Sequence, residues 1–377
     1  MAQAEKRLLL SYIWTESEKP MNASRTAFTL VRRLGLGLSI IALASLALLL
    51  SDWRHRSASA AMPRLAVFQY NSNLILDLSV RGLMDSLRDH GWVDGRTMEV
   101  RFFNAESDTG TMNSIAQEMV SGKYTHVITI STPCLQAVAR ANRDGKVKHI
   151  FGAVADPLAA RVGINPINPY DHPKWMAGIG SFMPVGEVLE MARQLNPRLR
   201  SVGLPWNPAE ANSQSFTHAA RESAHRLGIN LLEGNVENST VIGEVTDSLV
   251  ARGAEAILIT GDNTVAVGAN TLLASARKAR IPVIAALPSV VGSGVLFAIG
   301  ADFYQVGRQI GDLAARVLSG EDTAALPILY QIPKIFLIDR RVPAQLRDTW
   351  VFPPDVLAQA KDVSAAPPAG HATVVGK

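Results

Sequence analysis

The sequence predicts an α/β fold with two doubly wound parallel-sheet lobes and a cleft between them, preceded by an N-terminal hydrophobic helix. From residue 64 onward, short apolar runs alternate with amphipathic stretches, which is typical of βαβ units and a parallel sheet. The alternation breaks at the Pro- and Asn-rich segment 163–174 (GINPINPYDHPK), which we expect to be a loop. It then resumes in the same form, so the chain contains two similar halves.

The local patterns predict the elements of each half. In the first half we expect strands at 64–69, 97–104, 126–130 and 149–153, and helices at 77–90, 112–120 and 132–143. In the second half we expect strands at 201–206, 230–236, 256–260 and 281–285, and helices at 185–195, 209–227, 241–252 and 265–277. Strand-like stretches at 295–301 and 334–338 flank a further helix at about 303–318.

The order of these elements gives the expected domains. The first lobe is predicted to comprise 61–180 and about 286–325, and the second lobe 181–285 and about 326–361. Residues 362–377 are small and polar enough to form a disordered tail. Ligands sit beyond the carboxyl ends of the strands in open α/β sheets, so two such sheets facing each other predict a small-molecule cleft.

Residues 1–60 are predicted to be a leader. Its apolar run, 34–50 (LGLGLSIIALASLALLL), is longer than the roughly 7–15 residues of a signal-peptide core and shorter than the roughly 20 of a spanning helix. The small-x-small sequence at 58–60 favours cleavage and the charges at 51–56 favour a retained anchor, so both alternatives stay open, as does a true start at Met21. Basic residues before the run place the rest outside the cytoplasm, either periplasmic or outward-facing and membrane-anchored.

The positive charge of the chain lies in the leader. Residues 1–60 contain eight of the 37 Lys and Arg residues and four of the 33 Asp and Glu residues, so the remainder is formally neutral. A nucleic-acid-binding domain usually concentrates positive charge, so we expect no nucleic-acid partner. Cys134 is the only cysteine, which excludes an intrachain disulfide, Cys-pair redox chemistry and a Cys-rich zinc site.

Sequence motifs for catalysis are missing. The chain has no G-x-S-x-G elbow, no P-loop, no H-E-x-x-H and no full G-x-G-x-x-G. Its eight histidines are scattered, and the spacing of His218 and His225 is too long for a metal pair on adjacent helical turns. We therefore expect a protein that is not an enzyme and that has no cofactor or metal.

Polar and aromatic residues gather where the predicted strands end. The candidate ligand-binding residues are Gln69, Asn71, Ser131, Thr132, Asp156, Ser181, Trp206, Asn207, Asp262 and Asn263. Thr132 suits an N-cap and Pro133 the first helical position, and a helix N-terminus with a hydroxyl binds a carboxylate well. The alternative is that Thr132 only caps its own helix.

Two of these candidates are carboxylates that follow strands, Asp156 and Asp262. Each is placed to pair with a ligand ammonium, but Asp is also an ordinary turn and N-cap residue. Trp206 stands at the end of the strand SVGLPW, where its ring is placed either to stack on a ligand ring or to pack within the lobe.

Seven stretches stand in a fairly specific order and spacing. They are RGLMDSLRDHGWVDGRTMEV, ISTPCLQAVARA, VADPLAARVG, LNPRLRSVGLPWNPAEANS, ILITGDNTV, RIPVIAALPSVVGSGVLFAIGADFYQVGRQIGDLAARVLSGE and FLIDRRVPAQL. Together they resemble the ABC-transporter substrate-binding proteins of the tryptophan/tyrosine uptake type, which have the type I periplasmic-binding-protein fold. The resemblance covers about 64–361.

The resemblance implies two lobes that close on a small amino-acid-like ligand, aromatic in characterised members, and deliver it to a membrane permease powered by an ATPase. It also implies that Thr132 and its neighbours hold a carboxylate, and that Asp156 and Asp262 are polar contacts from opposite lobes. The alternative function is the ligand-sensing periplasmic module of a membrane signalling system, which would use the same lobes.

The sequence departs from the family pattern at three places near the expected cleft. Residues 71–73 (NSN) stand where the family often has an acidic-His-Pro stretch, and 206–208 (WNP) stand in place of Tyr-Asn-Pro. Residues 177–181 (AGIGS) replace the usual Gly-Asn-Val-Thr-Gly crossover. These departures leave the identity of the ligand open.

Overall fold

The computed structural model describes residues 43–46, 62–290 and 294–364 of the chain. The chain divides into two units at residues 62 and 63, and the two lobes described below both belong to the second unit. Of the predicted leader, the helical residues 43–46 are described, so the predicted signal peptide or anchor lies almost wholly outside the described residues. Among the residues that are described, no helix combines the length and the apolarity needed to cross a membrane.

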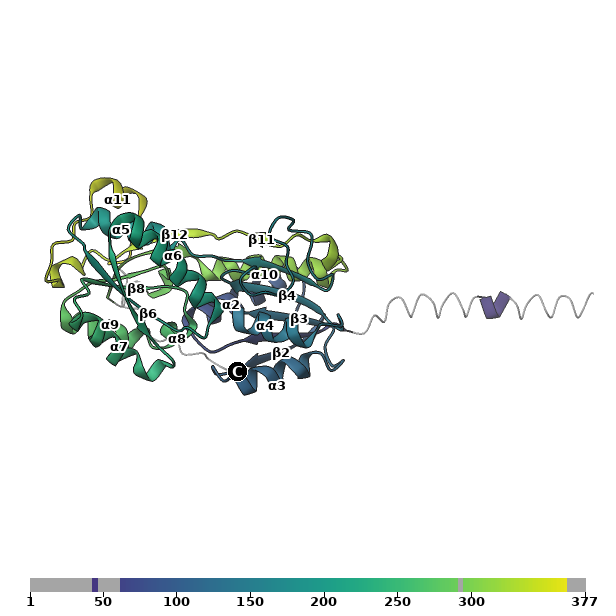
Figure 1. The fold of residues 1–377 in the computed structure, drawn as a ribbon. Coiled ribbons are helices and arrows are strands. Elements are labelled where there is room, and N and C mark those ends of the chain that lie inside the picture. Colours follow the sequence, from purple (N-terminus) through teal and green to yellow (C-terminus); the bar gives the residue numbers. More distant parts are fainter. Residues whose placement is uncertain (1–42, 47–61, 291–293, 365–377) are drawn as a thin grey trace, which may run out of the picture. The chain divides into compact units, whose positions relative to one another are not determined.

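The first lobe is built on a sheet of six parallel strands in the order β11-β5-β4-β3-β1-β2 (Figure 1). Its strands are β1 (Arg64–Gln69), β2 (Glu99–Asn104), β3 (His126–Ile130), β4 (Lys148–Val154), β5 (Met176–Gly180) and β11 (Leu329–Tyr330). Its helices are α2 (Leu74–Asp89), α3 (Thr109–Met119), α4 (Thr132–Ala141) and α10 (Phe303–Leu318), with a 3-10 turn at Thr323–Ala325. The predicted loop at 163–174 is confirmed, since it contains neither helix nor strand.

Helices cover both faces of this sheet because its strands place apolar side chains on both faces. In β1, Leu65 and Val67 join the core that α2 and α10 form, whereas Ala66 and Phe68 join the core that α3 and α4 form. Successive strand residues point to opposite faces, so a strand that is apolar throughout is buried on both sides. This is the doubly wound arrangement that the sequence predicts.

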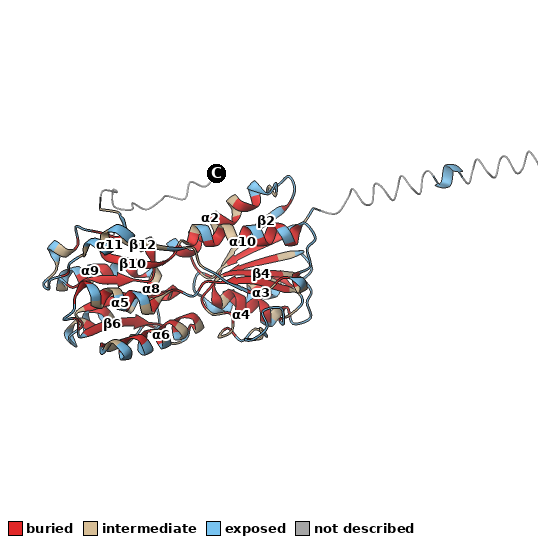
Figure 2. Ribbon diagram, turned by 90° about the horizontal axis from the view of Figure 1, so that it is seen from above, coloured by how far each residue is buried: buried red, intermediate tan, exposed pale blue. Residues whose placement is uncertain are grey.

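The second lobe has seven strands in the order β13-β12-β10-β9-β8-β6-β7. The strands are β6 (Ser201–Trp206), β7 (Asn230–Asn235), β8 (Ala256–Ile259), β9 (Val283–Ala285), β10 (Val295–Ala301), β12 (Lys334–Ile338) and β13 (Lys361–Asp362). The helices are α5 (Val185–Leu195), α6 (Ala211–Leu227), α7 (Ile242–Ala251), α8 (Asn263–Val267), α9 (Ala269–Ala279) and α11 (Pro354–Gln359), with 3-10 turns at Ser239–Val241, Pro288–Val290 and Pro343–Gln345. Figure 2 shows the strands of both lobes buried between helices that expose their outer faces.

The two-lobe α/β fold is confirmed, and several local features differ from the prediction. β12 runs antiparallel to β10, so the second sheet is not wholly parallel. The short strands β5, β11 and β13 were not predicted. The predicted tail is ordered at its start, because β13 pairs with β12 and Val363 donates its N–H to Ile338 O (3.0 Å).

The chain passes between the lobes three times, after β5, after β10 and after β11. The predicted boundaries near 286 and 326 were wrong in position. β10 was expected in the first lobe, but it pairs with β9 and β12 and so belongs to the second sheet, whereas β11 pairs with β5 in the first sheet. Lobe membership depends on pairing between distant strands, which local patterns do not specify.

Helix α2 begins three residues earlier than predicted because Asn73 caps it. The Asn73 side-chain oxygen accepts from the N–H groups of Ile75 (3.0 Å) and Leu76 (3.1 Å). α2 then packs closely against α10, where Gly82 and Gly307 leave room for the two backbones to approach. A Cβ atom at either glycine would overlap the backbone of the facing helix. This contact brings the start of α10 beside the start of α2.

Candidate ligand-binding site

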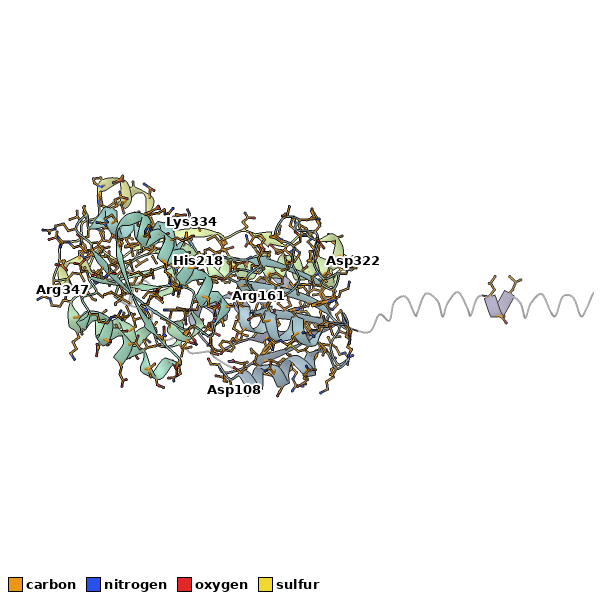
Figure 3. The ribbon with its side chains drawn as sticks, viewed as in Figure 1. Asp108, Arg161, His218, Asp322, Lys334 and Arg347 are labelled. Carbon is orange, nitrogen blue, oxygen red and sulfur yellow. The ribbon has the colours of Figure 1, made fainter. Side chains whose placement is uncertain are left out.

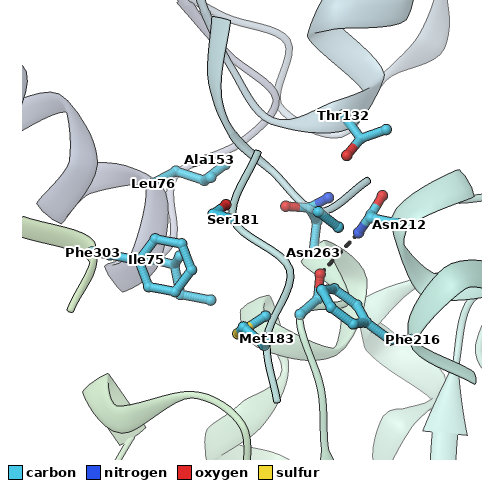
Figure 4. Close-up of a pocket in the computed structure, with 12 residues that line it drawn as sticks. Ile75, Leu76, Thr132, Ala153, Ser181, Met183, Asn212, Phe216, Asn263 and Phe303 are labelled. Carbon is cyan, nitrogen blue, oxygen red and sulfur yellow. Dashed lines mark hydrogen bonds between the residues drawn. The ribbon is translucent and has the colours of Figure 1, made fainter. Parts of the chain in front are cut away.

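A cavity lies between the two lobes, beside the chain crossings (Figure 4). Its lining comes from the first lobe (Ile75, Leu76, Thr132, Ala153, Ala155, Phe303), from the first crossing (Ser181, Met183) and from the second lobe (Asn212, Phe216, Gly261, Asn263). The cavity is narrow: the volume open to the centre of a water molecule is about 20 Å³. That is room for about one water molecule, so a larger ligand requires the lobes or the lining side chains to separate.

The start of α4 presents a buried hydroxyl to this cavity. The N-cap is Ser131, whose side chain accepts from the Cys134 N–H (3.5 Å), and not Thr132 as predicted. Thr132 is therefore free of the capping role. Its side chain is 2% exposed, and its Oγ1 has no hydrogen-bond partner among the described residues. An unpaired buried polar atom is unfavourable unless something else pairs with it, so this atom marks a position for a ligand group.

The backbone beside Thr132 is strained. Ser131 has φ 120° and ψ 158°, a region that is essentially restricted to glycine, and Ala153 on β4 has φ 51°. Each such residue costs about 1–3 kcal/mol, and surrounding structure has to hold it in place. The Ser131 N–H donates to Gly152 O (3.2 Å), which ties the two strained strand ends together. Strain of this kind clusters where a protein binds ligands.

The opposite part of the cavity is apolar. Ile75 and Phe303 lie on one side, and Met183 and Phe216 lie on another, as Figure 4 shows. The ring of Phe216 packs on Phe182, with 4.9 Å between the ring centroids. A Cβ atom at Gly261 would overlap Met183 and Phe216, so glycine is needed there for these side chains to reach the cavity.

Asp262 is completely buried and joins segments of the second lobe beside the cavity. Its Oδ2 accepts from the Asn207 N–H (2.6 Å) and the Ser213 hydroxyl (2.6 Å), and its Oδ1 accepts from the Val265 N–H (2.8 Å). Burial, and after it the neighbouring Glu210 carboxylate, raise the pKa of Asp262. Both oxygens are thus occupied by protein donors, which makes Asp262 a support for the site.

Glu210, also buried, is the second carboxylate behind the lining. Its Oε2 accepts from the side chains of Asn212 (3.1 Å) and Asn263 (2.7 Å), and from the Asn263 N–H (3.1 Å). Its Oε1 accepts from the Thr264 N–H (3.1 Å) and hydroxyl (2.6 Å). Burial raises the pKa of Tyr70 in the first lobe to about 12, and the Glu210 carboxylate adds to this shift.

Asn212 connects this carboxylate to the cavity. Its side-chain nitrogen donates to Glu210 Oε2 (3.1 Å) and to the backbone oxygen of Gly261 (2.8 Å). Its Oδ1 is buried and has no hydrogen-bond partner in the described part of the chain. Asn212 and Thr132 thus bring two unpaired polar atoms to one cavity, one from each lobe.

The ten predicted site residues fall into three groups. Thr132, Ser181 and Asn263 line the cavity. Ser131, Asn207 and Asp262 stand behind the lining and make hydrogen bonds within the protein. Gln69, Asn71, Asp156 and Trp206 are not among the lining residues.

The residues of the last group have local partners. Gln69 donates to Ser72 and Asp77, and Asn71 donates to Ser107 and accepts from Asn73. Asp156 Oδ1 accepts from the N–H groups of Leu158 (2.9 Å) and Ala159 (3.1 Å), as a turn-forming Asp does. Trp206 packs within the second lobe, with the Arg221 guanidinium 5.5 Å from its ring centre.

The sequence reasoning missed Glu210, Asn212, Phe216 and the apolar residues on the first-lobe side. The sequence does indicate Glu210 and Asn212, because both closely follow residues 206–208 at the end of a predicted strand. Phe216 lies one helical turn beyond Asn212, on the same face of α6. Extending the strand-end rule into the first two turns of the following helix would have found all three.

None of the histidines that the structure describes is among the residues that line this cavity. His218, labelled in Figure 3, is exposed on α6 and lies 3.8 Å from Glu222. Over residues 62–290 and 294–364, no three His, Cys, Asp or Glu side chains are arranged to hold a metal ion together.

A comparison with known protein families identifies the chain. The model of the family described as ABC transporter substrate binding protein matches residues 64–363. The chain belongs to this family. ABC substrate-binding proteins are solute-binding proteins rather than enzymes, act outside the cytoplasm, and work with a small-molecule ligand and a transporter.

Similar proteins agree with this assignment. A tyrosine-binding protein of Clostridioides difficile is 27% identical over 278 residues, which cover 74% of this chain and 79% of that protein. A conserved domain protein of Vibrio cholerae has a crystal structure with a TM-score of 0.74 at 28% identity, covering 80% of this chain and 99% of that one. The ABC domain of a Streptococcus pneumoniae protein in complex with L-Trp has a TM-score of 0.73 at 23% identity, with the same coverage.

Proposed function

We propose that this ABC substrate-binding protein captures an α-amino acid with an aromatic or other apolar side chain and delivers it to an ABC permease with its ATPase. The observation that carries the proposal is the unpaired Thr132 hydroxyl, buried at the start of α4 and facing the cavity between the lobes. The family assignment favours uptake over the alternative of a sensing module in a signalling system.

The carboxylate of the ligand binds at the start of α4 in this proposal. The N-terminus of a helix carries a partial positive charge, and the Thr132 hydroxyl adds a donor beside it. Ser131 already caps the helix, so the hydroxyl is available to the ligand without loss of the cap. Asp156 and Asp262, which the sequence predicted as partners for a positive ligand group, are not assigned that role here, since neither lines the cavity.

The side chain of the ligand lies against the apolar part of the cavity. Ile75, Met183, Phe216 and Phe303 offer aliphatic and aromatic contacts there, and burial of an apolar side chain against them contributes about 25 cal/mol per Å². The tyrosine-binding relative and the L-Trp complex of a fold neighbour support an aromatic amino acid.

The narrow cavity supports binding by lobe closure. Ser181 and Met183 belong to the first crossing, and Phe303 directly follows the second, so hinge residues also line the cavity. A ligand that contacts both lobes favours the closed arrangement, because its contacts exist only there. We propose a periplasmic location, either free after cleavage or held by the leader on the outer side of the membrane.

Titration calorimetry of the purified protein tests the proposal. L-Tyrosine, L-tryptophan and L-phenylalanine should give saturable heat, whereas glycine and myo-inositol should bind at least tenfold more weakly. Glycine keeps both charged groups but lacks the apolar contact, and myo-inositol lacks charge altogether. Tighter binding of myo-inositol than of every aromatic amino acid would overturn the proposal.

A further inference from the structure

We propose that Asn212 recognises the protonated amino group of the ligand, and that Glu210 is the positioning residue that turns the Asn212 amide so that its oxygen faces the cavity. The inference rests on the proposed function, because it assigns the second charged group of the same ligand. It names two residues that sequence reasoning did not single out.

Hydrogen bonding fixes which end of the amide faces the ligand. The Asn212 nitrogen donates to two groups that can only accept, the Glu210 carboxylate and the Gly261 carbonyl. Turning the amide over would set its oxygen against both acceptors and lose both hydrogen bonds. The oxygen is therefore held on the side of the amide away from these two acceptors. There it is buried and has no hydrogen-bond donor among the described residues, in a side chain that lines the cavity.

The charge behind the amide favours a cation. Glu210 and Asp262 are both buried, and every hydrogen bond that the structure shows to their oxygens comes from an uncharged amide or hydroxyl. In the part of the chain that the structure describes, no salt bridge joins either carboxylate to a Lys, Arg or His. A ligand ammonium at Asn212 would bring a positive charge close to both carboxylates in a low-dielectric site.

The positions of the two unpaired atoms suit an α-amino acid. α4 and α6 contact each other across the two lobes. In Figure 4 the Thr132 hydroxyl and the Asn212 oxygen lie on the same side of the cavity, away from Ile75 and Phe303. An α-amino acid carries its carboxylate and ammonium on one carbon, so a ligand held by these two atoms places both groups on that side of the cavity while its side chain extends to the apolar wall.

The experiment compares an amino acid with its deaminated and decarboxylated analogues. The wild-type protein is titrated with L-tryptophan, indole-3-propionate and tryptamine, and with L-tyrosine, 3-(4-hydroxyphenyl)propionate and tyramine. The wild type should bind the tighter amino acid at least tenfold better than its deaminated acid, because without the ammonium the Asn212 oxygen stays without a donor and the charge of the hydrogen-bonded carboxylates behind it stays without a counter-ion among the described residues. Equal affinities of the wild type for the amino acid and for its deaminated acid would overturn the inference without any variant.

Two variants then separate recognition from positioning. Asn212→Ala should reduce the ratio to about threefold or less, mainly by weakening the amino acid, while the deaminated acid binds almost as before. Glu210→Gln should also reduce the ratio, because its side-chain amide cannot accept all the donors that the carboxylate holds. A merely structural role for Glu210 would weaken both ligands equally and leave the ratio unchanged, which would contradict the positioning role. Binding of neither amino acid by the wild type would instead overturn the proposed function itself.

Discussion

Replacing Thr132 with Val is the sharpest single perturbation of the proposed site. The substitution exchanges a buried hydroxyl for a methyl group of nearly the same size at the start of α4. Since Oγ1 has no partner among the described residues, the substitution breaks no hydrogen bond within them. Loss of stability and loss of binding are therefore predicted to separate at this position.

The expected magnitudes follow from the chemistry of the hydroxyl. A hydrogen bond to a charged group contributes about 1.5–3 kcal/mol, so Thr132→Val should weaken binding of the amino acid roughly 10- to 150-fold. An unsatisfied buried polar group is itself unfavourable by about 1–3 kcal/mol, so the free energy of unfolding of the ligand-free variant should stay equal or rise.

Calorimetry with L-tryptophan and L-tyrosine measures the affinity, and urea denaturation without ligand measures the stability. Thr217→Val is the matched control, since Thr217 on α6 is also fully buried with an unpaired Oγ1 but does not line the cavity. The control should show the same effect on stability and no effect on affinity. Binding by Thr132→Val within threefold of the wild type would refute the assignment of the carboxylate to α4.

Three further predictions concern stability and motion. Burial lowers the pKa of His149 to about 3, so its stabilising contribution is present above its unfolded pKa of about 6.5 and is lost as the pH falls. Urea titrations of the wild type and His149→Asn measure this effect. Between pH 7 and pH 5 the unfolding free energy of the wild type should fall by about 2 kcal/mol more than that of the variant, and a constant difference between the two proteins would contradict the prediction. Asp262→Ala should lower the unfolding free energy by at least about 2 kcal/mol, because three donors lose their acceptor, whereas Asp156→Ala should lower it by about 1 kcal/mol; similar values for both would refute the supporting role of Asp262. Saturating amino acid should reduce the radius of gyration in solution scattering relative to the ligand-free protein, whose lobes have to separate before a ligand larger than a water molecule can enter; an unchanged radius with confirmed binding would contradict lobe closure.

The regular elements could be predicted because their signals are local. The short apolar runs at 64–69 and 126–130 predicted strands at those positions, and the amphipathic pattern of 185–195 predicted α5. What failed depends on distant partners. The lobe to which β10 belongs is decided by its pairing with β9 and β12, and nothing within 295–301 specifies that pairing.

The candidate site was predicted in part for a similar reason. Strand ends selected Thr132 and Asn263, which line the cavity, but the same rule selected Asp156 and Asp262, whose oxygens accept from nearby N–H groups. A carboxylate that follows a strand suits a turn and a ligand equally well, so the sequence cannot separate the two. Asn212 was missed because the face of α6 that meets the other lobe is set by the arrangement of the lobes.

The proposed binding mode can be seen directly in a crystal structure of the exported part with the tighter-binding of L-tyrosine and L-tryptophan. We expect the ligand between the lobes, with a carboxylate oxygen within hydrogen-bond distance of Thr132 Oγ1. We expect the ammonium at Asn212 Oδ1 and the aromatic ring against Phe216 and Phe303. A ligand bound outside this cavity, or one whose carboxylate points into the second lobe, would contradict it.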